Sequence, residues 1–317
     1  MLRFVYSIFR KDGKDGKYPE SLVKKAIERA VDGTDPWIRA VSGYKKKLRP
    51  AVLHAIDHVV AMVDASAKPL LLDHESYDTN PVLRNFFISK ADLARFLERD
   101  KDLAEFKGKQ GRGWQGATAL LLMRKAERGI LGAVLSGEVV MRDVQQTTVS
   151  FEGHRLLDLS TTEEDTLYQL KKRAFDHLLG IALGRITDIK TRRGKLEKHR
   201  VLLQSKLDLL QREGWGFDDG AEGKMSVAGV EKMLGEIDAR LLEIGKDDKM
   251  LDVYLGVVTD VLGHAEEHLW VKKEKLIIDR MGIKRKEPAN DAPEVTLDVM
   301  GDAAGRNLVA SLVFIPA

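Results

Sequence analysis

Cysteine is absent from the 317 residues of this chain, and aromatic residues make up only 6% of it. A chain without cysteine has no disulfide, no thiolate metal ligand and no cysteine nucleophile. No apolar run approaches the length of about 18 residues that a membrane-spanning helix needs. The apolar stretch at the N-terminus is shorter than the core of a secretory signal and has charge on both sides. We therefore expect a cytoplasmic protein.

The N-terminal residues 1–11 leave two interpretations open. On a helix, Leu2, Val5 and Phe9 would share one face, with Arg3 beside them. That pattern is typical of a short amphipathic segment that contacts a membrane surface. The alternative is a strand or helix that packs on the body of the protein.

Charged residues form 32% of the chain, yet the net charge is only +3. Their distribution is uneven, because residues 1–50 hold thirteen Lys or Arg against six Asp or Glu, a net charge of +7. High charge with few aromatics is typical of long solvent-exposed helices. The sequence thus predicts a basic N-terminal region and a slightly acidic remainder.

Periodicity and capping residues predict a mainly helical, α+β fold. Pro19 and Gly33 bracket one expected helix, and Ser89 is placed to cap another. The expected helices cover residues 19–32, 48–64, 89–99 and 117–128, with a short helical piece at 35–43. The expected strands cover residues 130–135, 139–157, 295–299 and 307–315. The simplest assembly is a small antiparallel sheet that pairs strands from both sides of the central helices.

Two central helices carry an apolar repeat with alternating spacings of three and four residues, the pattern of a coiled coil. The first is expected to end near Glu213, and the second is expected to run from Ser226 to about Leu269. A glycine-rich linker joins them, which favours antiparallel packing within one chain. We therefore expect a long antiparallel two-helix coiled-coil arm. The predicted domains are a mixed body with the basic N-terminal region (1–158), the arm (160–285, tip about 214–225) and a C-terminal β segment that returns to the body (286–317).

Two histidine pairs are candidate metal ligands. The segment from His264 to His268 reads H-x-x-E-H, the inverted zinc-protease pattern, in which Glu267 would be the general base. A third ligand and a substrate cleft are not evident. His54 and His58 repeat the same spacing on another expected helix, and a metal site would form if the two helices met. The alternative is that all four histidines are solvated or hydrogen-bonded. We therefore expect no cofactor, unless these histidines bind a transition metal.

The segment Gly111–Gly116 matches the dinucleotide-binding pattern G-x-G-x-x-G, with Glu138 at the distance of a ribose ligand. The strand that should precede the pattern is missing, because the residues before it favour a helix. A simpler hypothesis is that Lys107, Lys109 and Arg112 contact a phosphate at a helix start. The third hypothesis is that this segment is a loop without a ligand.

Basic clusters suggest contacts with nucleic acid. Lys45, Lys46, Lys47 and Arg49 form one cluster, and a second covers residues 185–200. Aromatic residues that stack on bases are scarce near both. A charged face on a helix is also what solvent exposure alone requires.

Trp215 and Phe217 lie between glycines at the expected tip of the arm. Large aromatic residues at such a tip either anchor a protein partner or fold back over the ends of the helices.

Taken together, these features predict a non-enzymatic scaffold or protein-interaction protein that uses a coiled-coil arm and binds a protein partner or a second copy of itself. Nucleic-acid binding through the basic N-terminal face and metal binding through the histidine pairs are the alternatives.

Overall fold

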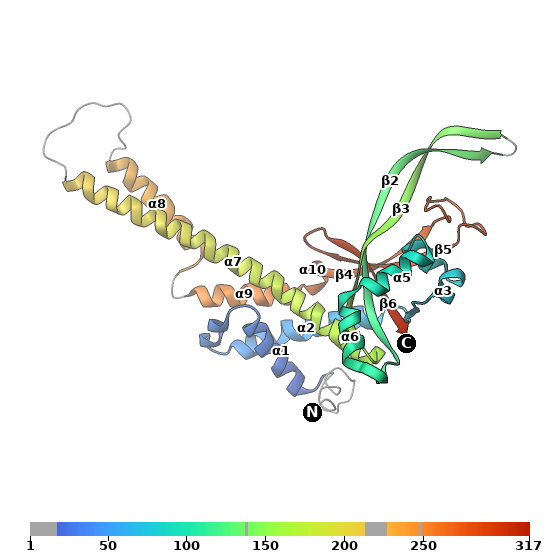
Figure 1. The fold of residues 1–317 in the computed structure, drawn as a ribbon. Helices are drawn as coiled ribbons and strands as arrows, with labels where there is room; N and C mark the ends of the chain where they lie inside the picture. Colours follow the sequence, from blue (N-terminus) through green and yellow to red (C-terminus); the bar gives the residue numbers. More distant parts are fainter. Residues whose placement is uncertain (1–17, 137–138, 213–226, 247–248) are drawn as a thin grey trace. The chain divides into compact units, whose positions relative to one another are not determined.

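The computed structural model describes residues 18–136, 139–212, 227–246 and 249–317, which form two compact units (Figure 1). Among the described residues, the helical unit consists of residues 18–55, 176–212, 227–246 and 249–264, and the sheet unit of residues 56–136, 139–175 and 265–317. The division falls inside two helices, α2 (Tyr44–Asp64) and α7 (Glu163–Arg212), so each of these helices contributes to both units. The fold is mixed α and β, and is less dominated by helices than the sequence suggests.

In the helical unit, capping residues fix where the first helices begin and end. Helix α1 (Glu20–Asp32) starts after Pro19 and ends at Gly33, as predicted. The 3-10 helix η3 (Pro36–Ala40) starts at Asp35, whose side chain accepts a hydrogen bond from the Trp37 amide. Helix α2 begins at Tyr44.

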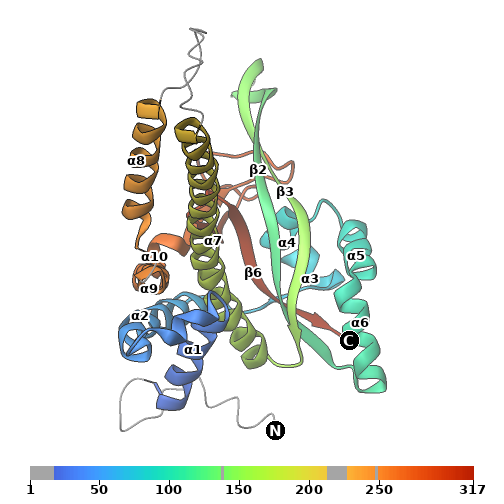
Figure 2. The ribbon, with the colours of Figure 1, turned by 90° about the vertical axis from the view of Figure 1, so that its left-hand side faces the viewer.

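The remaining helices of this unit are α7, α8 (Val227–Ile244) and α9 (Met250–Gly263), and Figures 1 and 2 both show α8 beside the C-terminal half of α7. The prediction of a long first helix is confirmed. The prediction of one uninterrupted helix from 226 to 269 is wrong, because Gly245 adopts a φ of +141° that no helix accommodates. The chain then resumes as α9, and strand β4 already begins at Leu269. The two-helix coiled coil therefore stays a prediction.

The sheet unit contains strands β1 (Leu70–Leu71), β2 (Gly116–Ser136), β3 (Val139–Ser160), β4 (Leu269–Ile277), β5 (Glu294–Asp302) and β6 (Asn307–Pro316). Their order is β3-β2-β6-β5-β4, with antiparallel neighbours throughout, and β1 adds a short parallel pairing to β6. The predicted antiparallel sheet, built from segments on both sides of the central helices, is confirmed. The short helices of this unit are α3 (His74–Thr79), α4 (Pro81–Phe86), α5 (Lys90–Arg99), α6 (Lys101–Gln110), η4 (Gly111–Gly113) and α10 (Ala265–His268).

The first half of β2 was expected to be a helix, and that prediction is wrong. Its side chains are buried on both faces of the sheet. Leu121 and Met123 belong to a core with Leu83 and Leu93 from helices α4 and α5. Leu120 points to the other face and packs with Leu170 and its neighbours. Burial on both faces removes the alternation that marks a strand, so the run Ala-Thr-Ala-Leu-Leu-Leu-Met resembles a helix by propensity alone.

Strands β2 and β3 continue past the end of β6 as a two-stranded ribbon (Figure 1), since pairing of β2 with β6 ends at Met123. The β2–β3 ladder shifts register three times, and each shift adds one residue to β3. A residue with positive φ lies at each shift: Asp143 (60°), Gly153 (69°) and Asp158 (54°). These are β-bulges, which increase the right-handed twist of the ribbon.

Within the described ranges, no helix combines the length and the hydrophobicity that a membrane span requires. The predicted amphipathic contact at residues 1–11 lies outside the residues that the structure describes.

Candidate functional site

Helix α8 packs against the C-terminal half of α7 in an antiparallel pair. Leu203 and Leu207 of α7 form an apolar cluster with Val230, Leu234 and Ile237 of α8. At the edges of this cluster, Arg200 Nε lies 2.7 Å from Asp238 Oδ1, and Arg193 Nη1 donates a 2.7 Å hydrogen bond to the Gly245 carbonyl. Residue numbers rise along α7 as they fall along α8, so the pair is antiparallel.

A second apolar stripe on α7 does not face α8. Leu202 and Leu209 are 68% and 57% exposed. They lie one heptad apart, so they share a face of the helix at a separation of about 10.5 Å. Lys198 and Lys206 flank this stripe at one turn before and after Leu202, and both are exposed. Within the described part of the chain neither lysine makes an ion pair. We call Lys198, Leu202, Lys206 and Leu209 the α7 stripe.

The predicted tip anchors Trp215 and Phe217 lie outside the described residues, and their role stays a prediction.

Much of the positive charge of the cluster at residues 45–49 is compensated by carboxylates. Lys45 Nζ lies 2.9 Å from Glu28 Oε1, and Lys47 Nζ lies 3.0 Å from Asp252 Oδ1. Arg49 Nη1 lies 2.7 Å from Glu20 Oε1. The exposed side chain of Lys46 completes the cluster. These pairs reduce the attraction that the cluster exerts on a phosphate backbone.

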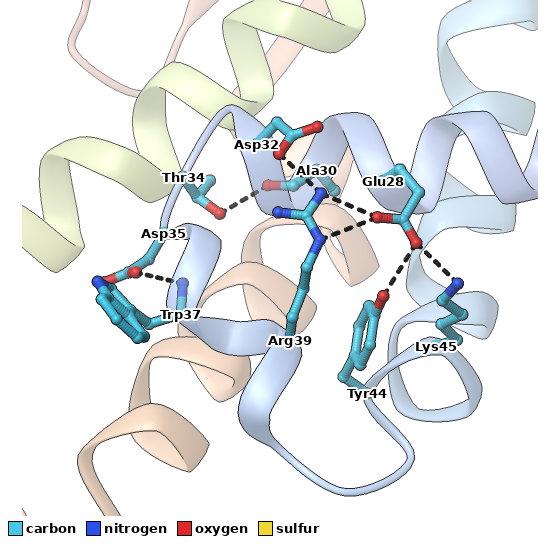
Figure 3. A network of polar contacts seen from close by, with 9 residues as sticks. All are labelled: Glu28, Ala30, Asp32, Thr34, Asp35, Trp37, Arg39, Tyr44 and Lys45. Carbon is cyan, nitrogen blue, oxygen red and sulfur yellow. Dashed lines mark hydrogen bonds and ion pairs between the residues drawn. The ribbon is translucent and has the colours of Figure 1, made fainter.

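Glu28 is the centre of this network (Figure 3). Its carboxylate is paired with Lys45 and accepts hydrogen bonds from Arg39 at 2.9 and 3.1 Å and from the Tyr44 hydroxyl at 2.9 Å. The hydrogen bonds from Lys45 and then Arg39 lower the pKa of Glu28 to about 2. The network joins α1, η3 and α2, which assigns a structural role to several of the basic residues that suggested nucleic acid.

The G-x-G-x-x-G segment does not have the geometry of a dinucleotide site. Its first residues form the 3-10 turn η4, and Gly116 opens a strand where the motif requires a helix. A Cβ atom on Gly116 would lie 2.7 Å from the Phe314 ring, so packing against β6 explains this glycine. Glu138 lies outside the described residues.

The three cations beside that segment were candidates for a phosphate contact. Lys107 Nζ lies 5.2 Å from the centroid of the Trp114 ring, and Lys109 Nζ lies 2.6 Å from Glu105 Oε1. Arg112 lies within the η4 turn. The helix start that the phosphate hypothesis places here is absent, because η4 leads into β2.

The H-x-x-E-H segment is not one continuous helix. Helix α9 ends at Gly263, His264 has the non-helical angles φ −126° and ψ 44°, and α10 starts afresh at Ala265. A spacing of four residues therefore does not place His264 and His268 on one helical face, and the predicted geometry around Glu267 is lost. Among the described residues, no group of three or more His, Asp or Glu side chains is arranged to hold a metal ion.

The four histidines of the predicted pairs differ in their partners and in their burial. His58 Nε2 is 2.7 Å from the Leu269 carbonyl oxygen. His264 Nδ1 is 3.0 Å from the Asp260 carbonyl oxygen. His268 is buried, with 5% of its surface exposed. His54 lines a surface groove together with His264.

That groove has a volume of about 720 Å³ and lies between α2 and α9 in the helical unit. The structure thus brings together one histidine from each predicted pair, His54 and His264. The groove's carboxylates are already engaged, since Asp252 pairs with Lys47 and Asp260 with Arg185. Pro50, Ala51, Leu255 and two glycines of α9 form its apolar part. Within the groove, His264 Nδ1 lies 3.3 Å from Asp260 Oδ1. The groove has the character of a shallow seam between two helices.

No protein-family model, curated protein or solved structure matches this chain. Sequence reasoning missed the α7 stripe, because it followed only the apolar seam; the heptad spacing of Leu202 and Leu209 is the signal that would have found it.

Proposed function

We propose that this protein is a non-enzymatic scaffold that binds a protein partner through the helix pair α7–α8. The observation that carries the proposal is the α7 stripe. Helix α8 contacts the face of Leu203 and Leu207, whereas Leu202 and Leu209 remain exposed on another face of the same helix. A third helix laid along α7 would bury both leucines by the packing used in helical bundles.

The flanking lysines define the chemistry of the partner. Lys198 and Lys206 favour a helix that carries acidic residues beside an apolar stripe, since opposite charges at the edges of a helical interface select the partner and its orientation. Because the two leucines are 68% and 57% exposed, their burial contributes about 2–4 kcal/mol before the entropic cost of association is subtracted. We therefore expect a moderate, reversible interaction with an amphipathic acidic helix.

The experiment compares the intact protein with a Leu202→Glu/Leu209→Glu variant in affinity purification from native cells, with and without nuclease. The matched control is Leu242→Glu, because Leu242 is 59% exposed on α8 and lies outside the stripe. A partner identified from the wild type is then purified and its Kd measured with all three proteins. We expect the double variant to weaken this Kd at least tenfold and the control to leave it unchanged. An unchanged Kd in the double variant would overturn the proposal.

The same purification includes a Trp215→Ala/Phe217→Ala variant. Loss of the partner in this variant alone would move the contact from the α7 stripe to the tip of the arm.

Nucleic-acid binding through the basic N-terminal face is the second candidate, supported by the net charge of +7 in residues 1–50. The ion pairs of Lys45, Lys47 and Arg49 argue against it. A phosphate-dominated contact weakens steeply as salt is raised. Proteins that make many phosphate contacts typically lose about 10³–10⁵-fold in affinity between 50 and 200 mM salt. An affinity for a duplex oligonucleotide that falls at least tenfold over this range would favour this alternative.

A further inference from the structure

A hollow of about 520 Å³ opens on the sheet unit between helix α5, its junction with α6, and strand β3. Volumes of this order are typical of sites for small molecules. Two kinds of side chain dominate its lining. One kind is aromatic (Phe87, Phe96 and His154) and the other is cationic (Arg95, Arg99 and Lys101).

The aromatic wall is a packed cluster of three rings. The Phe87 and His154 rings are stacked, with centroids 4.6 Å apart and an interplanar angle of 22°. Phe96 lies against both, at 5.5 Å from Phe87 and 5.7 Å from His154. Phe87 is buried, whereas Phe96 and His154 are partly exposed. A planar ligand would meet the accessible surfaces of Phe96 and His154.

A β-bulge orients His154 towards this wall. The residue follows Gly153, whose positive φ of 69° marks one of the register shifts of β3. Bulges recur beside functional sites because they redirect a side chain. His154 Nε2 lies 2.8 Å from the Phe86 carbonyl oxygen. A carbonyl oxygen only accepts, so Nε2 carries the hydrogen and donates it.

The other ring nitrogen then has a defined role. Burial lowers the pKa of His154, so the ring is uncharged near neutral pH. A neutral imidazole that carries its hydrogen on Nε2 presents Nδ1 as an acceptor. The wall therefore combines an apolar ring surface with a ring nitrogen, Nδ1, that can accept a hydrogen bond.

The cationic rim consists of Arg95, Arg99 and Lys101. Among the residues that the structure describes, Arg95, Arg99 and Lys101 make no ion pair. Arg95 Nε donates only a 3.3 Å hydrogen bond to the Ala91 carbonyl. Some other arginines of the sheet unit do pair with carboxylates: Arg285 lies 2.6 Å from Asp279, and Arg306 lies 2.5 Å from Asp302.

Two carboxylates also line the hollow, and they do not cancel the rim. Asp100 caps α6 by accepting a 2.8 Å hydrogen bond from the Leu103 amide. Asp92 is the second. Three cations against two carboxylates leave a net charge of +1 in the lining. Neighbouring cations of like sign repel each other, and a bound anion relieves that repulsion.

We infer that this hollow binds a nucleoside phosphate, with the phosphate on Arg95, Arg99 and Lys101 and the base against Phe96 and His154. Guanidinium groups suit phosphate oxygens, and rings of this kind stack on bases. A base with an exocyclic amino group would donate a hydrogen bond to His154 Nδ1. The ligand is either a free nucleotide or one nucleotide of a single strand. The site belongs to the sheet unit and is independent of the α7 stripe.

The test measures binding of AMP, adenosine, inorganic phosphate and a fifteen-residue oligo(dA) to the full chain by calorimetry. We expect AMP to bind at least tenfold more tightly than adenosine or phosphate alone, because each of those lacks one half of the recognised group. An oligo(dA) affinity at least tenfold above that of AMP would identify the single strand as the source; the reverse order would identify the free nucleotide. Failure of both AMP and oligo(dA) to bind would overturn the inference.

The site is located with an Arg95→Gln/Arg99→Gln variant. Both side chains are exposed, so their neutralisation leaves folding intact, which an unchanged Tm would verify. The matched control is Lys273→Gln, an exposed cation on β4 outside the hollow. We expect the double variant to lose at least tenfold in affinity for AMP or oligo(dA) and the control to retain wild-type affinity. Equal affinities in all three proteins would place the ligand elsewhere and overturn the assignment.

Discussion

Lys190 of α7 donates a 2.7 Å hydrogen bond to the carboxylate of Asp35, whose side chain is 3% exposed. The other oxygen of that carboxylate accepts a 2.9 Å hydrogen bond from the Trp37 amide, drawn in Figure 3. Lys190 Nζ also lies 5.1 Å from the centroid of the Tyr254 ring. One half-exposed lysine thus neutralises a buried carboxylate and links η3, α7 and α9 within the helical unit.

Replacement of this lysine should destabilise the helical unit. Lys190→Ala leaves the Asp35 carboxylate buried without its cation, and we expect a loss of about 1–3 kcal/mol in the free energy of unfolding. The double variant Asp35→Asn/Lys190→Ala should recover part of the loss, because the buried charge is gone. Urea denaturation measures both, with Lys198→Ala as the exposed control on the same helix. A cost within 0.5 kcal/mol for Lys190→Ala, the range of ordinary surface changes, would contradict this account.

The Glu28 network predicts a loss of stability in acid. The pKa of Glu28 falls from its usual 4.5 to about 2 in the folded protein, through Lys45 first and Arg39 second. A lowered folded pKa means that the stabilisation is complete above pH 4.5 and is lost as the pH falls to 2. Because the side chain is 34% exposed, solvent screening limits the effect to about 1 kcal/mol or less. Denaturation at several pH values should show a shallower acid decline for Glu28→Gln than for the wild type.

Two glycines of β2 give a matched test of packing. A Cβ atom on Gly116, which has a φ of 119°, would lie 2.7 Å from the Phe314 ring and 2.8 Å from the Ile315 carbonyl oxygen. We expect Gly116→Ala to cost about 2–4 kcal/mol through the clash and the strained backbone. Gly129 has nothing within 4 Å of that position, so Gly129→Ala should be neutral or slightly stabilising. Similar thermal unfolding of the two variants would contradict the β2–β6 register.

Two leucines of α7 give a similar test of the helix pair. Leu207 is 8% exposed against α8, whereas Leu209 is 57% exposed. We expect Leu207→Ala to cost about 2–3 kcal/mol and Leu209→Ala to stay within about 0.5 kcal/mol in chemical denaturation. Equal costs would mean that α8 does not pack on the Leu203–Leu207 face, and the α7 stripe would lose its basis.

Capping residues in the sequence were sufficient to predict helix ends, because helix ends depend on interactions between residues close in sequence. Pro19 and Gly33 mark the ends of α1, and the Ser89 side chain accepts a hydrogen bond from the Asp92 amide at the start of α5, as its position predicts. The first half of β2 was mistaken for a helix because partners from distant parts of the chain bury both of its faces. The break after α8 was missed because the apolar spacing continues through Gly245, while the backbone does not.

The candidate sites were harder to predict, because the carboxylates that pair with their cations and the rings that pack against their histidines lie far away in the sequence. Nothing around Lys47 indicates that Asp252 pairs with it. His154 is a lone histidine in a strand, and its stacking partner Phe87 comes from the end of α4, far earlier in the chain. Charge patterns locate basic segments, but only the fold shows which cations keep their charge available to a ligand.

The three bulges give β3 three residues more than its ladder with β2 requires. Of the two strands of the hairpin, only β3 therefore carries residues without a pairing partner on the other strand. Removal of the extra residue at Asp143, Gly153 or Asp158 would leave the remaining cross-strand pairs in place and reduce the twist. A deletion within the paired part of β2 would instead add a fourth mismatch. Changes in the length of this hairpin among related chains should accordingly fall on β3, with β2 held at constant length.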